Sequence, residues 1–269
     1  MKKLVILLVA GMLFLTGCST NNDDNDNEGR DVLKVGMELA YPPFETSDLQ
    51  GNPAGVSVEI AKAFAEYLDM DIDIQNINWT GLIPSLQTNQ VDMVISSMTI
   101  TEERRESVDF SDPYARALLA LIVPIDLEIE SSDELNDAQY TIAVKTGTTG
   151  DTFATSNFDQ ANILRFDDES AAIAEVVNNR AQAFVYGQLT ILRNAAANPE
   201  TTKPYFLSGQ QNEGWGAAFP KGSDLTQQFN EFLVEFRAQG GFDDLVDEFL
   251  AEEKALFDSY GFDFFFDFD

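Results

Sequence analysis

The sequence predicts an α/β fold with largely parallel sheets, and three observations support this prediction. Short apolar runs with strand character alternate with amphipathic helical segments along the chain, which is the pattern of strands joined by helical crossovers. Apolar residues recur at helical spacing over residues 57–68, whereas residues 71–77 alternate in the manner of a strand. At 269 residues, the chain is long enough for one large core or two ordinary ones.

The predicted elements follow one another in this alternating order. The strands are short apolar or alternating runs bounded by polar turns, and the helices carry apolar residues three and four positions apart. The expected strands are residues 33–37, 71–77, 91–95, 118–123, 140–144, 182–186 and 215–219. The expected helices are residues 57–68, 80–86, 168–178, 190–197, 223–237 and 242–257.

The first residues are predicted to be an export signal followed by a lipid attachment site. Two lysines precede an apolar run at residues 4–15, which is too short to span a bilayer as a mature helix. The run ends in Leu-Thr-Gly before Cys18, the only cysteine of the sequence, and this pattern is similar to a bacterial lipobox. We therefore expect residues 1–17 to be a lipoprotein signal peptide and Cys18 to be acylated; an ordinary signal peptide with an incidental cysteine is the alternative.

The composition of the chain indicates which kinds of partner the protein can bind. Residues 18–31 are polar and acidic, so we predict a flexible tether between the membrane and the folded part. The formal charge of −30 argues against a nucleic-acid partner, because phosphate binding needs a basic surface. Such an acidic surface suits a salt-rich environment, where screening weakens self-repulsion, although an ordinary acidic protein would look the same.

The sequence contains no histidine. This excludes histidine-based triads, histidine acid–base catalysis and histidine metal sites. No other set of residues is arranged for bond-making, and we expect neither a metal nor a cofactor.

Hydroxyl, aromatic or charged side chains follow directly after four of the predicted strands, in segments that we call strand exits. Ligands of such sheets bind at the carboxyl ends of the strands. The exits are residues 37–41, 96–99, 145–149 and 186–188, and the last of them begins with Tyr186. We therefore expect a binding site where these exits meet.

Arg104 is the candidate anion-binding residue at the second exit. Thr101 is a good N-cap, and Arg104 lies in the first turn of the helix that it would begin. Backbone N–H groups already favour anions there, and a guanidinium adds a planar fork that can hold a carboxylate. The hydroxyl groups beside it are those of Ser96, Ser97 and Thr99. A solvated helix start with surface ion pairs is the alternative.

The stretch TGLIPSLQTNQVDMVISSMTITEERRESVDFSDPY resembles the signature of the family 3 solute-binding proteins, the polar amino acid receptors of ABC importers. Other segments agree in order and spacing: LKVGMELAYPPFE, GNPAGVSVEIAKAFAEYL, IAVKTGTTG and WGAAFPKGSDL. The resemblance covers essentially the whole chain after the tether. It implies a type II periplasmic-binding-protein fold, with two lobes that each hold a mixed, mostly parallel sheet flanked by helices. Two crossing hinge strands join the lobes, which close on the ligand.

The same resemblance implies the domain limits. The first lobe is expected to be discontinuous, comprising residues 32–114 plus 216–269, and the second lobe to comprise residues 119–211. The hinges are expected at about residues 114–118 and 212–215. The C-terminal stretch YGFDFFFDFD alternates aromatic and acidic residues; we predict that its aromatics pack on the first lobe, with a partner-docking or frayed tail as the alternative.

The resemblance also implies roles for the ligand-binding residues. Arg104 would grip the ligand carboxylate, helped by Thr99 and by Thr149 of the opposite lobe. Tyr41 and Trp79 would form aromatic walls around the aliphatic part of the ligand. Each wall residue could instead belong to ordinary core packing.

Four further positions match ligand contacts of the family. Glu38 matches an acidic position that meets the ligand side chain, with a solvated strand-end carboxylate as the alternative. Ser96 and Ser97 match backbone or hydroxyl contacts, and Lys145 matches a residue that touches the ligand only in some members.

One position departs from the family pattern. Most relatives have an aspartate that binds the ligand ammonium where this chain has Gly187. Either a nearby acid such as Glu38 or Glu213 substitutes, or the ligand lacks a standard α-ammonium, or the alignment slips. The sequence thus predicts a carboxylate ligand more firmly than an α-amino acid.

We expect an extracytoplasmic, lipid-anchored and monomeric receptor that delivers a small carboxylate-bearing solute, a polar amino acid, to an ABC permease with its ATPase. One rival is an enzyme on the same fold, similar to cyclohexadienyl dehydratase. A sensory ligand-binding module is the other rival, and the lack of a signalling segment argues against it.

Overall fold

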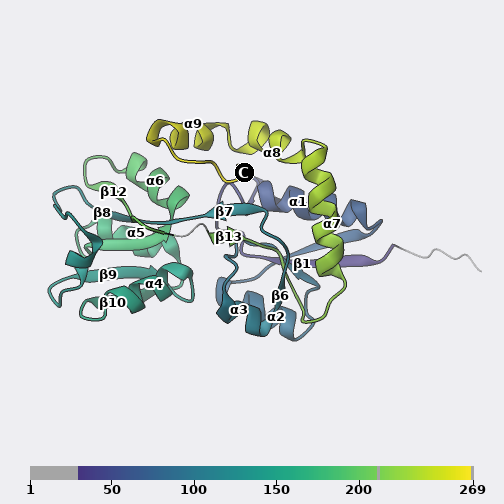
Figure 1. The fold of residues 1–269 in the computed structure, drawn as a ribbon, viewed down its shortest axis with the longest axis horizontal. Coiled ribbons are helices and arrows are strands. Elements are labelled where there is room, and N and C mark those ends of the chain that lie inside the picture. Colours follow the sequence, from purple (N-terminus) through teal and green to yellow (C-terminus); the bar gives the residue numbers. More distant parts are fainter. Residues whose placement is uncertain (1–29, 211–212, 268–269) are drawn as a thin grey trace, which may run out of the picture. The chain divides into compact units, whose positions relative to one another are not determined.

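The computed structural model describes residues 30–210 and 213–267 (Figure 1). The chain divides into two compact units, Met1–Arg30 and Asp31–Asp269, and every described helix and strand lies in the second. The predicted signal peptide, Cys18 and nearly all of the tether lie outside the described residues. Within the described ranges, no helix is long and apolar enough to cross a membrane.

The first sheet has the strand order β4-β1-β5-β14-β6. Its centre is β1 (Val32–Met37), which pairs in parallel with β4 (Asp71–Asn76) and with β5 (Met93–Val94). β14 (Ala218–Phe219) runs antiparallel to both β5 and β6 (Asp109–Phe110). The sheet is therefore mixed, and it includes a strand from near the end of the chain.

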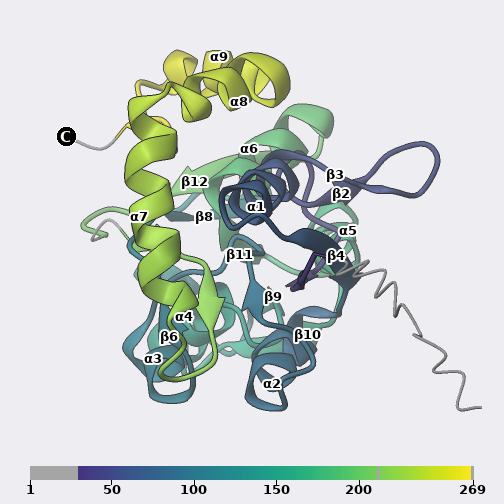
Figure 2. The same cartoon turned by 90° about the vertical axis from the view of Figure 1, so that its right-hand side faces the viewer.

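Helices from both ends of the chain cover the first sheet. Figure 2 shows α1 and α7 side by side, and Phe64 of α1 meets Phe229 of α7 with ring centroids 4.8 Å apart. The helices of this part are α1 (Val56–Tyr67), η1 (Trp79–Gly81), α2 (Leu82–Gln87), α3 (Glu102–Ser107), α7 (Leu225–Ala238), α8 (Gly241–Phe249) and α9 (Ala251–Tyr260). A small hairpin pairs β2 (Thr46–Ser47) with β3 (Pro53–Ala54).

The second sheet has the strand order β10-β9-β11-β8-β12. Its parallel strands are β10 (Asn162–Phe166), β9 (Thr141–Lys145) and β11 (Ala183–Gly187), and its antiparallel strands are β8 (Leu119–Pro124) and β12 (Thr202–Phe206). The helices that accompany it are η2 (Ser132–Leu135), α4 (Thr149–Asn157), α5 (Glu169–Val177) and α6 (Gln188–Ala197). Separate apolar clusters lie on its two faces.

Two strands connect the sheets. β7 (Ala115–Ala117) carries the chain from the first sheet to the second, and β13 (Glu213–Trp215) returns it (Figure 1). They pair antiparallel, with Trp215 opposite Ala115. Two mixed sheets joined by two crossing strands confirm the predicted fold class.

Two of the predicted elements are each divided in the structure. The helix expected over residues 242–257 is two helices, because Leu250 leaves the helical region at φ −127°. The strand expected over residues 215–219 is also interrupted, between β13 and β14. A Cβ atom on Gly216 would lie 2.8 Å from the end of the Ile100 side chain, so any other residue there would force that side chain to shift.

Candidate functional site

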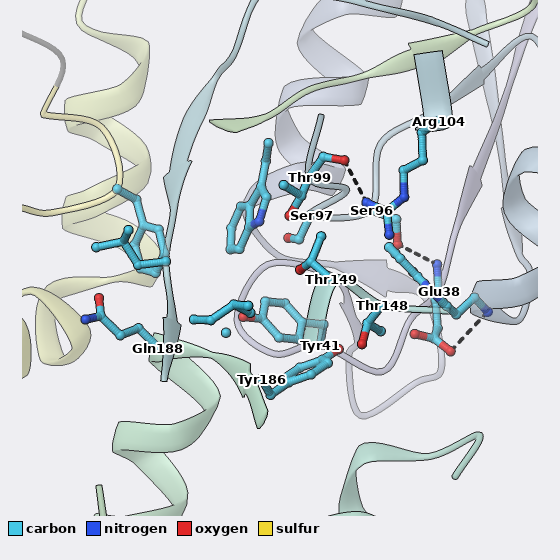
Figure 3. A pocket seen from close by; sticks show the side chains of 16 residues that line it. Glu38, Tyr41, Ser96, Ser97, Thr99, Arg104, Thr148, Thr149, Tyr186 and Gln188 are labelled. Carbon is cyan, nitrogen blue, oxygen red and sulfur yellow. Dashed lines mark hydrogen bonds between the residues drawn. The ribbon is translucent and has the colours of Figure 1, made fainter. Parts of the chain in front are cut away.

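A pocket between the two sheets brings together nine of the ten predicted ligand-binding residues. The volume of this pocket that the centres of water molecules can occupy is about 60 Å³. Its described lining residues are Glu38, Tyr41, Trp79, Ser96, Ser97, Thr99, Arg104, Leu118, Leu119, Thr148, Thr149, Tyr186, Gly187, Gln188, Trp215 and Phe265. Figure 3 shows Ser97, Thr99 and Arg104 on one side of the pocket and Thr148, Thr149 and Tyr186 on the other.

Arg104 is held so that its guanidinium spans the cleft. Thr101 caps α3 as predicted, because its hydroxyl accepts a hydrogen bond from the Arg104 N–H at 3.2 Å. The guanidinium donates to the Thr99 carbonyl at 2.6 Å and to the Gly147 carbonyl of the second sheet at 3.2 Å. It also lies 5.2 Å from the centroid of the Trp79 ring. These contacts fix the plane of the guanidinium, as bidentate carboxylate binding requires.

Glu38 is part of a buried ion pair. Its carboxylate pairs with the ammonium of Lys145, and the two side chains are 14% and 3% exposed. The same carboxylate accepts a hydrogen bond from the Trp79 N–H, and the Glu38 N–H donates to the Ser96 hydroxyl at 3.0 Å. Lys145, the one predicted residue that does not line the pocket, thus reaches the site through Glu38 and balances its charge.

Aromatic side chains surround the space in front of Arg104. The Tyr41 ring meets those of Tyr186 and Trp215 edge-on, at 6.0 and 5.9 Å between centroids. Trp79 donates from its indole nitrogen to the Gly147 carbonyl at 3.1 Å. Tyr41 and Trp79 both line the pocket, where they provide apolar surface for the aliphatic part of a ligand.

Gly187 makes room for the hydroxyl of Tyr41. A Cβ atom at position 187 would lie 3.1 Å from that hydroxyl, which is closer than side chains normally approach. The hydroxyl also hydrogen bonds with Thr190 of α6, and burial raises the pKa of Tyr41. The space of the usual aspartate is therefore partly occupied by a tyrosine from the other side of the cleft.

This geometry predicts the outcome of adding the missing aspartate. Gly187→Asp is expected to lower stability and amino acid affinity, because crowding a packed site costs roughly 1–3 kcal/mol. The double variant with Tyr41→Phe should recover affinity, because the crowding hydroxyl is gone. Calorimetric titration and thermal unfolding of both variants, with Tyr41→Phe alone as control, check this. A Gly187→Asp single variant that is as stable as wild type and binds amino acids more tightly would contradict the proposed steric conflict with Tyr41.

Glu45 is a buried carboxyl directly behind the pocket. Its oxygens accept hydrogen bonds from Ser57 and, at 2.9 and 3.0 Å, from the pocket residue Ser97. Burial raises the pKa of Glu45 to about 8, against the opposing effect of these hydrogen bonds. Ser97 has a left-handed φ of 46°, a strained conformation that its bond to Glu45 helps to hold. Among the described residues, the buried Tyr114 hydroxyl has no hydrogen-bond partner, and the charge of Glu45 adds to the rise in its pKa.

Glu169 is a second inward-facing carboxyl, which the sequence did not point to. It begins α5, yet one carboxyl oxygen is buried and has no hydrogen-bond partner within the described part of the chain. Burial raises the pKa of Glu169 to about 7, while Lys145 and the Tyr186 hydroxyl lower it. The charge of Glu169 in turn raises the pKa values of Tyr41 and Tyr186, so the group lies close to both pocket tyrosines.

Other lining residues also escaped the sequence reading. Thr148 and Gln188 both belong to predicted strand exits but were not named as ligand contacts, and Trp215 was assigned to a strand. Phe265 comes from the C-terminal stretch, where no sequence signal marked a ligand contact. Of the acids considered for the ammonium, Glu38 is paired with Lys145, and the side chain of Glu213 lies outside what the structure describes.

Within the described residues, no group of three or more Cys, Asp or Glu side chains is placed to hold a metal ion. The pocket instead offers a fixed guanidinium, several hydroxyls and aromatic walls. Two α/β lobes with such a pocket between them define a binding protein of the periplasmic type.

Comparison with known proteins identifies the family. Residues 33–252 match the model of the bacterial extracellular solute-binding proteins, family 3. The chain is 30% identical to a probable histidine-binding protein of Neisseria gonorrhoeae, over 94% of this chain and 97% of that protein. The chain belongs to the family 3 solute-binding proteins, as the sequence predicted.

Two solved structures are also similar. A putative binding component of an ABC transporter from Wolinella succinogenes, complexed with lysine, has a TM-score of 0.76 and 30% identity, over 82% of this chain and 96% of that one. An ancestral amino acid-binding protein described as a precursor of cyclohexadienyl dehydratase has a TM-score of 0.74 and 33% identity, over 81% and 95%. The family consists of extracellular solute-binding proteins, and the relatives carry the names of binding proteins, so this chain is a solute-binding protein that works outside the cytoplasm and not an enzyme.

Proposed function

We propose that the chain is the receptor of an ABC importer, capturing a small carboxylate-bearing solute by hinge closure and delivering it to the permease. The observation that supports this best is the fixed guanidinium of Arg104, which faces hydroxyls and aromatic walls inside a small pocket between two sheets. The lobes are proposed to comprise residues 32–114 plus 216–269 and residues 119–211, with hinges at 114–118 and 212–215. A lipid on Cys18 would anchor the protein to the membrane as a monomer.

We propose a polar amino acid with an uncharged side chain as the ligand. Relatives carry names for histidine and arginine binding, and one similar structure is a complex with lysine. Here Glu38 already neutralises Lys145, so a second cation in the pocket would be buried without a free counter-charge. A neutral polar side chain avoids this cost.

We further propose that Glu169 supplies the negative charge missing at Gly187. Its carboxyl interacts with both tyrosines next to that glycine, and one of its oxygens has no partner within residues 30–210 and 213–267. A ligand ammonium in front of Tyr41 and Tyr186 would feel this charge in a poorly hydrated site, where charges interact strongly.

The Glu169 assignment predicts a pH dependence. Since the pKa of Glu169 is raised to about 7, affinity for an α-amino acid should rise between about pH 6 and pH 8 as the group ionises. Glu169→Gln should weaken amino acid binding about tenfold at pH 8, as expected for loss of a charged partner, and should flatten the pH profile. The matched desamino carboxylic acid, titrated in parallel, should bind both proteins alike; an equal loss for both ligands would contradict the assignment.

A ligand screen tests the proposed function. Thermal unfolding of the protein would be followed with the twenty amino acids, opines, betaines and ectoine at low and high salt, because bound ligand raises the melting temperature by mass action. Glutamine, asparagine, serine or threonine is expected to raise it most, and lysine and arginine least. The proposal fails if no carboxylate stabilises the protein.

A further inference from the structure

The C-terminal aromatic segment, residues 260–267, contributes to the pocket although it lies beyond the family match. That match ends at residue 252. The segment follows α9 and returns toward the pair of crossing strands (Figure 1). It includes Phe264 and Phe265, which are 2% and 5% exposed. These two rings are thus buried in the fold, although Tyr260, Gly261, Asp263 and Asp267 of the same segment are exposed.

The segment contacts both sides of the cleft. On the first side, Phe266 packs on Phe242 of α8, with ring centroids 4.7 Å apart. On the second side, Phe262 packs edge-on against Phe206 of β12, also at 4.7 Å. The prediction that its aromatics pack on the first lobe is therefore incomplete, because an aromatic partner from the second sheet lies within contact distance.

Polar contacts fix the segment to the crossing strand β7. The backbone N–H of Arg116 donates to the carbonyl of Phe265 at 2.8 Å. The guanidinium of Arg116 pairs with the carboxylate of Asp263, also at 2.8 Å. Because both contacts come from one residue of a crossing strand, the backbone at Phe265 is held at a defined position next to the pocket.

Phe265 separates two cavities. Its ring stacks on Trp215, with centroids 5.3 Å apart, and meets Phe44 edge-on at 5.1 Å. On one side it lines the binding pocket, and on the other a second cavity of about 190 Å³, measured as for the pocket. Leu118 and Gln188 also line both spaces. The two spaces thus share this wall of three residues.

We propose that Phe265 is a specificity-determining residue that limits the length of the ligand. The inference deepens the proposed function and rests on it. With the ligand carboxylate on Arg104, a side chain that grows toward Phe265 meets a packed aromatic ring supported by Trp215. A longer ligand would have to displace that ring, and interior packing resists such displacement. The pocket therefore selects short ligands although empty space lies beyond the wall.

The test is the chain-length profile of binding in wild type and Phe265→Ala. The probes are linear L-α-amino acids with four to eight carbons, titrated by calorimetry and by thermal shift. Wild type should lose affinity sharply beyond a certain length. Phe265→Ala should bind the longer probes at least tenfold more tightly than wild type does, because each additional buried methylene contributes about fourfold.

Phe264→Ala is the matched control. Phe264 has the same chemistry and burial, packs on Phe257 and does not line the pocket. This variant should lose stability but keep the wild-type length profile. An unchanged profile in Phe265→Ala, or an equal change in both variants, would overturn the proposal.

A crystal structure of Phe265→Ala tests the wall without any ligand. Continuous space between the pocket and the second cavity supports the proposal, and collapse of neighbouring side chains into the gap overturns it. Failure of the proposed function would look different: wild type would bind none of the probes while the two cavities still merge in the variant.

Discussion

Arg104→Ala is expected to weaken ligand binding by roughly 1.5–3 kcal/mol, or about ten- to a hundredfold, the usual contribution of a hydrogen-bonded charged group. The guanidinium is fixed by carbonyls from both sides of the cleft and by the Trp79 ring. Alanine would remove both the charge that faces the carboxylate and a direct contact between the two sheets. Calorimetric titration with the ligand found by the screen measures the effect.

Two variants make the arginine experiment specific. Arg104→Lys keeps the charge but loses the planar fork, so it should recover only part of the affinity. Arg105→Ala removes the neighbouring cation, which lies 3.8 Å from Glu102 at the surface and does not line the pocket. It should bind like wild type. Unchanged affinity in Arg104→Ala would show that Arg104 does not bind the ligand carboxylate.

Arg104 also illustrates what could be predicted from sequence. Its place in the first turn of a capped helix follows from local chemistry, and the structure has that helix at Glu102–Ser107. The strong helical period at residues 57–68 likewise corresponds to α1 at Val56–Tyr67. Such features depend on neighbours in the chain, so local reasoning reaches them.

Elements with weak local patterns were missed. The helix α4 (Thr149–Asn157) buries only Gly150 and Ala154, so it lacks an apolar stripe. A Cβ atom on Gly150 would lie 2.3 Å from the carbonyl oxygen of Val185; close packing against β11, rather than helix propensity, places this helix. The strand β10 (Asn162–Phe166) lies at a sheet edge and has no buried residue, so its sequence lacks the usual alternation.

Contacts between residues far apart in the chain could not be predicted from local sequence patterns. The sequence marked Gly187 as a departure, but the close contact that this glycine accommodates is with the hydroxyl of Tyr41, distant in the chain. Phe265 and Glu169 likewise reach the site only through the tertiary fold. Strand exits and family resemblance located the pocket, whereas the residues that shape its limits follow from packing between distant segments.

Glu45→Gln is expected to change the pH dependence of stability. In the folded protein burial raises the pKa of Glu45 to about 8, from an ordinary value of 4.5 in the unfolded chain. Between these values the folded protein keeps a proton that the unfolded chain has lost, so rising pH favours unfolding. The contribution to stability is fully present below about pH 4.5 and is lost as pH rises through about 8. Its size is on the order of 5 kcal/mol, at about 1.4 kcal/mol per pKa unit.

Glutamine has the shape of a protonated glutamate and can still accept hydrogen bonds from Ser57 and Ser97. Urea unfolding at pH 5, 7 and 9 should therefore find the variant within about 1 kcal/mol of wild type at pH 5 and more stable at pH 9. Glu59→Gln, a surface change in an exposed pair with Lys62, should follow wild type throughout. Parallel curves for wild type and Glu45→Gln would show that Glu45 titrates normally. Because Ser97 both lines the pocket and bonds to Glu45, ionisation of Glu45 in the folded protein should disturb the ligand site only as pH rises through about 8.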